Sequence, residues 1–245
     1  TYPGAESPVL NDINFTAKPG QVTAFIGSTG SGKSTLVNLI PRLYDVTSGQ
    51  VLIGGCDVRQ LARRDLVKTL GFVPQKGVLF SGTVESNIKY ADSAISDEAM
   101  RDAAVTAQAD FIADLEGGYH AHIAQGGSNV SGGQKQRLSI ARALAKNPDV
   151  LIFDDSFSAL DYKTDAALRK ELAEKESDKT ILIVAQRIST IRHADQIVVL
   201  DNGAVVGTGT HEQLLRDCDV YREIASSQFS EEEMKKELKE AKHAK

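Results

Sequence analysis

Short runs of β-branched and other apolar residues recur along the chain, and each run ends at a glycine or a polar turn. These runs occupy residues 22–26, 51–53, 71–73, 150–153, 181–185, 196–200 and 204–206. Several are almost wholly apolar and lead into helix-like sequence, which is typical of parallel strands covered by helices on both faces. The last two runs flank the turn Asp201-Asn202-Gly203 and predict a hairpin. The pattern therefore predicts an α/β fold with a mainly parallel sheet.

The strand pattern disappears between about residues 81 and 147, where alanine-rich helical sequence replaces it. A helix is predicted over residues 96–109, because Asp97 and Glu98 stand in its first turn, where the helix dipole favours acidic side chains. We interpret this segment as a helical subdomain inserted into a core of about residues 1–80 and 148–229. The last sixteen residues, 230–245, carry five glutamates and five lysines and predict a solvated, fraying helix.

Composition excludes several classes of protein. The chain has 245 residues, of which 41% are hydrophobic and 25% charged, an ordinary globular balance. Its 28 basic and 33 acidic residues give a net charge of −5, so no overall positive field exists to hold a nucleic acid. No apolar run approaches the roughly 20 residues of a membrane-spanning helix, and the chain starts without a signal-peptide pattern. The two distant cysteines, Cys56 and Cys218, favour a reducing compartment over a disulfide.

A glycine-rich loop follows the first predicted strand and matches the phosphate-loop pattern G-x-x-x-x-G-K-[ST]. Its glycines let the backbone turn tightly and point N–H groups at phosphate oxygens, while Lys33 would reach the β- and γ-phosphates. Ser34 would place a hydroxyl on Mg²⁺. The simpler alternative is a strand-to-helix turn with an exposed lysine. The predicted nucleotide-binding residues of this loop are Ser28, Thr29, Gly30, Ser31, Gly32, Lys33, Ser34 and Thr35.

Two carboxylates, Asp154 and Asp155, stand directly after the buried-strand pattern of residues 150–153. Ligands collect at the carboxyl ends of parallel strands, so Asp154 is predicted to hold the Mg²⁺ of the nucleotide through water. An acid after a strand can instead cap a helix. The phosphate loop elsewhere in the chain favours the metal role.

Residues 130–138, Val-Ser-Gly-Gly-Gln-Lys-Gln-Arg-Leu, closely resemble the signature motif of ATP-binding-cassette (ABC) proteins. Ser131 can cap the helix that follows while the adjoining glycines leave backbone N–H groups open, which makes a second anion site. In this family two cassettes pair head to tail, and each ATP lies between one subunit's phosphate loop and the other's signature. The resemblance therefore implies that Ser131, Gly132, Gly133 and Gln134 contact a nucleotide held by a partner.

The resemblance extends over nearly the whole chain. It implies a P-loop NTPase core with a mainly parallel sheet, an N-terminal antiparallel β subdomain and an inserted helical subdomain, over residues 1–229. Tyr2 resembles the aromatic that stacks on adenine, although it could simply pack beside its Pro-Gly turn. Gln75 resembles the glutamine that touches Mg²⁺ and relays nucleotide state to membrane helices. Asp161 lies in a loop resembling the one that crosses the dimer interface, but it could merely cap the next helix.

The segment of residues 79–88 is especially similar to cassettes fused to the transmembrane helices of exporters. The resemblance thus implies ATP and Mg²⁺ as ligands and a location on the cytoplasmic side of a membrane. Just before the signature, exporters usually carry a glutamate in a loop where this chain has Gln125. We expect the transmembrane helices to lie upstream of Thr1, since the chain begins almost at Tyr2.

Two positions depart from active cassettes. Asp155 replaces the glutamate that polarises the attacking water, and Gln186 replaces the histidine that contacts the γ-phosphate. A carboxylate withdrawn by roughly 1 Å can cost about 100-fold in rate, and glutamine cannot carry the positive charge of a histidine. Because the phosphate loop, Asp154, Gln75 and the signature are intact, this pattern predicts an ATPase that binds ATP but hydrolyses it weakly at its own site.

The leading hypothesis is the degenerate half of a heterodimeric exporter, whose partner cassette carries the intact glutamate and histidine. Its other partner would be the transmembrane domain, and no nucleic acid is expected. A homodimeric exporter ATPase with slow hydrolysis is the first alternative. A soluble cassette that uses ATP as a conformational clamp is the second, and the exporter-like segment of residues 79–88 opposes it.

Overall fold

The computed structural model describes residues 1–243, and these fall into two compact units. The first unit contains residues 1–67 together with 180–245, and the second is the continuous segment 68–179. The division falls within helix α2 (Arg63–Thr69). The predicted helical subdomain, about 81–147, lies inside the second unit. In the part of the chain that the structure describes, no helix is both long enough and apolar enough to span a bilayer.

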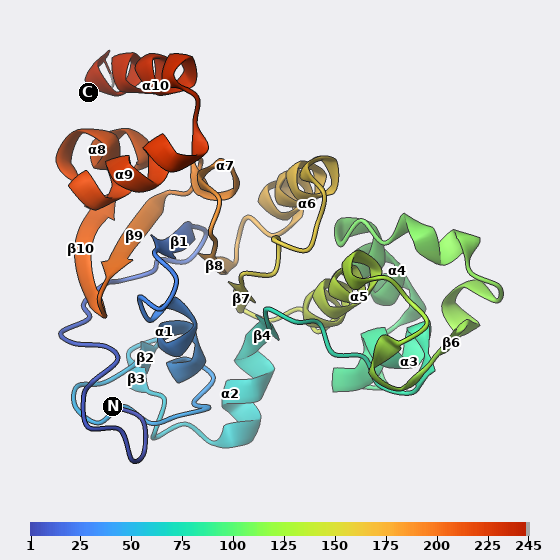
Figure 1. The fold of residues 1–245 in the computed structure, drawn as a ribbon. Helices are drawn as coiled ribbons and strands as arrows, with labels where there is room; N and C mark the ends of the chain where they lie inside the picture. The colour runs from blue at the N-terminus through green and yellow to red at the C-terminus, as the bar shows by residue number, and fades with distance from the viewer. Residues whose placement is uncertain (244–245) are drawn as a thin grey trace. The chain divides into compact units, whose positions relative to one another are not determined.

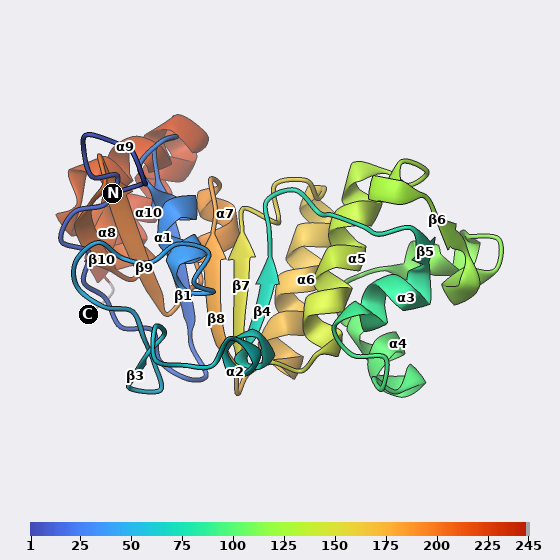
Figure 2. The same ribbon diagram turned by 90° about the horizontal axis from the view of Figure 1, so that it is seen from below.

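The first unit is built on a sheet with β1 in its interior (Figures 1 and 2). β1 (Val22–Gly27) pairs in parallel with β8 (Thr180–Val184) on one side and with β9 (Gln196–Asp201) on the other. β10 (Ala204–Gly209) returns antiparallel to β9. The side chains of Thr23, Ala24, Phe25 and Ile26 are completely buried, as the nearly continuous apolar pattern of this strand predicts. The predicted hairpin at residues 196–208 is confirmed.

The remaining elements of the first unit are short except at the C-terminal end. β2 (Leu52–Ile53) and β3 (Cys56–Asp57) form a small antiparallel pair. The helices are α1 (Lys33–Leu39), α7 (Ile188–Ile191), α8 (His211–Asp217), α9 (Asp219–Gln228) and α10 (Glu231–His243). In Figure 1 α8 and α9 lie between the β9–β10 hairpin and α10.

The second unit combines a parallel strand pair with a group of helices (Figure 2). β4 (Leu70–Val73) pairs with β7 (Val150–Asp154). The helices that contact one another are α3 (Val84–Ile88), α4 (Asp97–Thr106), α5 (Gly132–Ala145) and α6 (Tyr162–Lys175). Four 3₁₀ turns lie at Lys89–Ala91, Asp110–Asp114, Gly118–His120 and Gln125–Gly127. The helix predicted at 96–109 is present but ends at Thr106, since Gln108 has a left-handed backbone, and Ser96 caps its start by accepting from the Ala99 N–H.

The expectation that no strand occurs between residues 81 and 147 is wrong at one place. β5 (Gly82–Thr83) and β6 (His122–Ile123) form a two-residue antiparallel pair. Each strand is too short to show alternation, and the pairing joins positions about 40 residues apart. A local pattern could not reveal it.

The C-terminal segment is helical as predicted and most of its side chains are exposed, but one face of the helix is buried. Glu237 and Ala241 on α10 are buried, and the Glu237 carboxylate accepts from His211 Nε2 on α8 at 3.1 Å. Glu237 also pairs with Arg192 at the end of α7, at 3.0 Å. His211 is itself buried and contacts the Tyr221 hydroxyl at 2.7 Å, and burial raises the pKa of Tyr221. Residues 244 and 245 of the predicted tail lie outside the described residues.

Replacing Glu237 with alanine tests whether this buried cluster holds α10 in place. The change removes the carboxylate from two buried or half-buried donors, so we expect the free energy of unfolding to fall by about 2 kcal/mol. Glu240→Ala is the matched control, because Glu240 forms only an exposed pair with Lys236 at 3.8 Å. Its loss should cost less than about 0.5 kcal/mol. Urea unfolding measures both, and equal losses would contradict the role of Glu237.

Candidate functional site

The phosphate-loop sequence forms the connection between β1 and α1, as predicted. Gly30 has a φ of 85°, a left-handed conformation that favours glycine, and a Cβ built there would meet no atom within 4 Å. The loop therefore has open space at its centre, where a ligand can approach the backbone. At Gly27 a Cβ would lie 2.0 Å from the carbonyl oxygen of Leu200. Only glycine allows β1 to end against β9 at this point.

Lys33 holds its charge across the same loop. Its ammonium group donates to the carbonyl oxygens of Gly27 at 2.8 Å and Ser28 at 2.7 Å, and to the Ser31 hydroxyl at 3.3 Å. The lysine is therefore not a free surface group, and its contact with phosphate stays a prediction. An anion at the loop would meet a positive charge that is already in place.

Tyr2 lies beside the first turn of α1, although it is far from the loop in sequence. Its hydroxyl group is 2.9 Å from the Thr35 hydroxyl. Its ring packs edge to face on Tyr44, with the centroids 4.9 Å apart. The structure thus brings Tyr2 and Thr35, both predicted nucleotide contacts, together. The sequence reasoning missed that Tyr44 packs against the Tyr2 ring. Stacking of Tyr2 on adenine stays a prediction.

In the second unit the predicted acidic residues meet Gln75. β7 ends at Asp154, and both Asp154 and Asp155 are buried. The register Val73↔Phe153 places the residues after β4 beside those after β7, and Gln75 Nε2 donates to Asp155 Oδ2 at 3.0 Å. The next helix, α6, is capped by Asp161. Neither Asp154 nor Asp155 is therefore a helix cap, and that alternative is wrong.

Asp155 also has an unusual backbone. Its φ is 49°, in the left-handed region, and its carbonyl oxygen accepts from the Ser158 hydroxyl at 2.8 Å. Aspartate tolerates this conformation better than most residues because its short polar side chain can hydrogen-bond to nearby backbone groups. Asp155, which the sequence predicts to depart from active cassettes, therefore also suits the local backbone.

The predicted Mg²⁺ ligands are a hydroxyl, an amide and a carboxylate, from Ser34, Gln75 and Asp154. Oxygen donors of this kind fit Mg²⁺, which keeps several waters and needs few protein ligands. Among residues 1–243 no group of three or more His, Cys, Asp or Glu side chains could hold a metal. Ser34 belongs to the first unit, and Gln75 and Asp154 belong to the second.

The signature residues form the start of α5. Ser131 accepts from the Gln134 N–H at 3.2 Å, and Gln134 Oε1 accepts from the Ser131 N–H at 2.9 Å. This reciprocal bonding confirms that Ser131 caps the helix, as predicted, and satisfies two backbone groups at the helix start. A Cβ at Gly132 would meet nothing within 4 Å, so the turn is open on that side. A Cβ at Gly133 would lie 3.5 Å from the carbonyl oxygen of Ala159, which places the signature beside the 158–161 loop.

Asp161 caps α6 by accepting from the Thr164 N–H at 3.0 Å and from the Thr164 hydroxyl at 2.7 Å. The backbone bond and then the hydroxyl bond lower the pKa of the Asp161 carboxyl. Asp161 is therefore a helix cap, as the alternative interpretation predicted. A further contact of Asp161 with a partner subunit stays a prediction.

Gln186 follows β8 in the first unit, and its side chain is exposed. A side chain from α9 binds the backbone of the loop that carries Gln186. Gln228, at the end of α9, donates from Nε2 to the Gln186 carbonyl at 2.7 Å and accepts from the Ile188 N–H at 2.8 Å. The sequence reasoning missed Gln228, because it belongs to no motif and lies 42 residues from Gln186.

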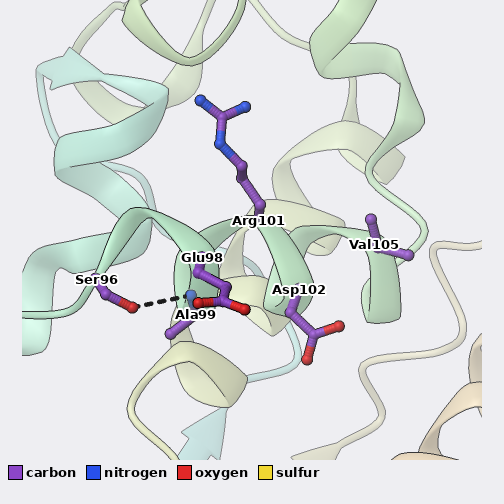
Figure 3. A pocket seen from close by; sticks show the side chains of 6 residues that line it. All are labelled: Ser96, Glu98, Ala99, Arg101, Asp102 and Val105. Carbon is purple, nitrogen blue, oxygen red and sulfur yellow. Dashed lines mark hydrogen bonds between the residues drawn. The ribbon is translucent and has the colours of Figure 1, made fainter.

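A surface hollow on α4 contains none of the predicted site residues. Figure 3 shows its lining, with Ser96 capping the Ala99 N–H and the Asp102 carboxylate on the same helix. Asp102 is paired with Lys175 at 2.8 Å. We therefore assign the nucleotide chemistry to the loops and not to this hollow.

A phosphate loop between β1 and α1, an acidic strand end at β7 and a capped signature turn together define a nucleotide-binding domain of the ATP-binding-cassette class. Comparison with known proteins agrees. The model of the family described as ABC transporter matches residues 10–158, and the chain belongs to that family.

Related proteins span far more than this chain. An uncharacterised ABC transporter ATP-binding protein of Mycobacterium tuberculosis is 53% identical over 231 residues, which are 93% of this chain and 40% of that protein. A proposed multidrug export ATP-binding/permease protein of Staphylococcus aureus is 46% identical over 228 residues, with 93% and 39% covered. The solved structure of a bacterial Atm1-family ABC exporter with ATP bound is 38% identical at a TM-score of 0.90, with 94% and 41% covered. The chain thus spans about two fifths of these relatives.

The backbone at Asp155 generates a prediction about stability. Asp155→Ala and Asp155→Gly both lose the bond from Gln75, but only glycine is at ease at a φ of 49°. We expect the glycine variant to be more stable than the alanine variant by about 1 kcal/mol in urea unfolding.

The same pair of substitutions at Glu174, an exposed residue within α6, is the control. There the order should reverse, with alanine more stable by about 1 kcal/mol. Greater stability of the alanine variant at both positions would mean that the left-handed backbone of Asp155 carries no strain.

Proposed function

We propose that this chain is the nucleotide-binding domain of an exporter and that it binds ATP with Mg²⁺ to drive transport. The observation that carries the proposal is the Lys33 ammonium group held across an open glycine loop. The Atm1-family exporter structure contains ATP, which supports the same ligand here. In such a transporter the domain works on the cytoplasmic side of the membrane.

Each predicted site residue has a binding role in this proposal. The loop residues 28–35 hold the phosphates, Tyr2 stacks on adenine, and Ser34, Gln75 and Asp154 hold Mg²⁺. Bound Mg²⁺ would neutralise the charge that develops on the phosphates. The bond from Gln75 to Asp155 keeps an accepting carboxylate oriented at the end of β7.

The partner of the signature is a second cassette. Ser131 and Gly132 are exposed, and Gly132 has free space around it. A capped helix start with open backbone groups is suited to an anion. We propose that Ser131, Gly132, Gly133 and Gln134 contact the nucleotide of the partner, while Asp161 approaches it from the adjoining loop.

We propose further that hydrolysis at this chain's own site is weak and that the partner is a different subunit with a competent site. Asp155 is one methylene shorter than glutamate, and Gln186 cannot become cationic. A homodimeric exporter with slow hydrolysis is the second candidate, favoured by the carboxylate that Asp155 retains. The exporter relatives oppose a soluble cassette.

An exposed aromatic surface supports docking of membrane helices on the second unit. Phe80 and Tyr90 stack with their centroids 4.2 Å apart, and both rings are substantially exposed. Arg142 lies over both rings and donates to the carbonyl oxygens of Asn87 and Val78. We propose that this surface, which follows Gln75 in the chain, contacts the transmembrane domain.

Nucleotide binding is tested by Lys33→Ala. Loss of a charge that contacts phosphate should weaken ATP binding by about 10- to 100-fold. Lys18→Ala is the control, because Lys18 is an exposed lysine of the same unit. Titration with a fluorescent ATP analogue measures both, with and without EDTA, and removal of Mg²⁺ should weaken binding to the unmodified chain. Equal affinities for the two variants would refute the proposal.

Weak hydrolysis is tested by replacing Asp155 and Gln186 with the glutamate and histidine expected in an active cassette. Asp155→Glu with Gln186→His should raise phosphate release by about 100-fold or more, because reach and charge at the γ-phosphate return together. The assay uses the assembled transporter with the partner's catalytic glutamate changed to glutamine, so that the signal comes from this site.

Each single variant should gain less than the pair, since both groups act on one transition state. The left-handed backbone at Asp155 costs the longer glutamate about 1 kcal/mol, so folding is checked by unfolding in urea. A folded, ATP-binding double variant without faster release would mean that another feature limits the site.

A further inference from the structure

Gln228 uses both polar atoms of its side chain on the backbone of the Gln186 loop. Its Nε2 donates to the Gln186 carbonyl at 2.7 Å, and its Oε1 accepts from the Ile188 N–H at 2.8 Å. The amide thus binds the loop backbone through one donor and one acceptor. The two bonds enclose Arg187, the last of the three residues between β8 and α7, whose own side chain supplies no cap to α7.

The side chain that makes these bonds stands on a fixed support. α9 buries Tyr221 and Ala225 completely, and the Tyr221 hydroxyl contacts buried His211 on α8 at 2.7 Å. α7, in contrast, has only four residues, too few to be stable by itself. The loop is thus the weaker partner, and its conformation follows that of α9.

We propose that Gln228 is a positioning residue that fixes the loop so that Gln186 reaches the nucleotide. The inference rests on the proposed function, in which Gln186 faces the γ-phosphate. The carbonyl that accepts from Gln228 belongs to Gln186. A change in this hydrogen bond therefore moves the backbone that carries the Gln186 side chain. Through Gln228 the C-terminal helices control how long ATP is retained at this site.

Hydrogen exchange and ATP release together test the proposal on the purified 245-residue chain. Gln228→Ala removes both bonds, so exchange of the Ile188 amide should accelerate about tenfold and release of a fluorescent ATP analogue about fivefold. Ser227→Ala is the matched control, since the Ser227 hydroxyl bonds only to the Ile224 carbonyl of its own helix. It should change neither rate by as much as about twofold.

Gln228→Glu separates the two bonds. A carboxylate still accepts from the Ile188 N–H but cannot donate to the Gln186 carbonyl. Ile188 should therefore keep its slow exchange while ATP leaves faster. A purely structural role for Gln228 would instead make release follow the exchange rate of Ile188 in every variant.

A double variant shows whether Gln228 acts through Gln186. Gln186→Ala should accelerate release, and adding Gln228→Ala to it should change release by less than about twofold. A full additional effect would overturn the positioning role, and so would unchanged release in Gln228→Ala when Gln186→Ala accelerates it. Failure of the unmodified chain to bind ATP would instead overturn the proposed function, whatever the exchange of Ile188.

Discussion

The close approach of Gly27 to the Leu200 carbonyl is the constraint on which the first unit depends. β1 is buried between two parallel neighbours, and a Cβ at its last residue would lie 2.0 Å from that oxygen. A residue with a side chain does not fit at Gly27, and the strand ends there, at the carboxyl edge of the sheet. Ligands of parallel sheets gather at this edge. The phosphate loop and Lys33 therefore lie directly after the end of β1, at the carboxyl edge of the sheet.

In the second unit the backbone and a hydrogen bond together hold Asp155, the residue that is proposed to weaken hydrolysis. Asp155 accepts from Gln75 and occupies a left-handed backbone that aspartate tolerates. A glutamate in the same conformation would reach further but would lack the local hydrogen bonding that a shorter side chain offers. In the proposed function, aspartate at this position therefore gives up reach and keeps local stability. This exchange is reasonable in a site whose proposed task is to retain ATP rather than to hydrolyse it.

Sequence reasoning succeeded where the signal was local. Buried strands such as β1 and β7, the phosphate loop and the Ser131 cap depend on residues a few positions apart, and each has a recognisable pattern. It failed where distant segments meet. The β5–β6 pair, the burial of Glu237 against His211 and the two bonds of Gln228 join residues 26 to 42 positions apart. Glu237, His211 and Gln228 do not differ in type from ordinary surface residues. Burial creates their roles, and composition alone does not encode burial.

The order of segments along the chain has a consequence for synthesis on the ribosome. The second unit is one continuous stretch, residues 68–179, so all of its partners emerge together. β1 emerges early, yet both of its neighbours, β8 and β9, come more than 150 residues later. An apolar strand without neighbours is exposed to wrong pairing until the last quarter of the domain is made. The first unit therefore needs protection during translation, while the segment inserted into it can fold first.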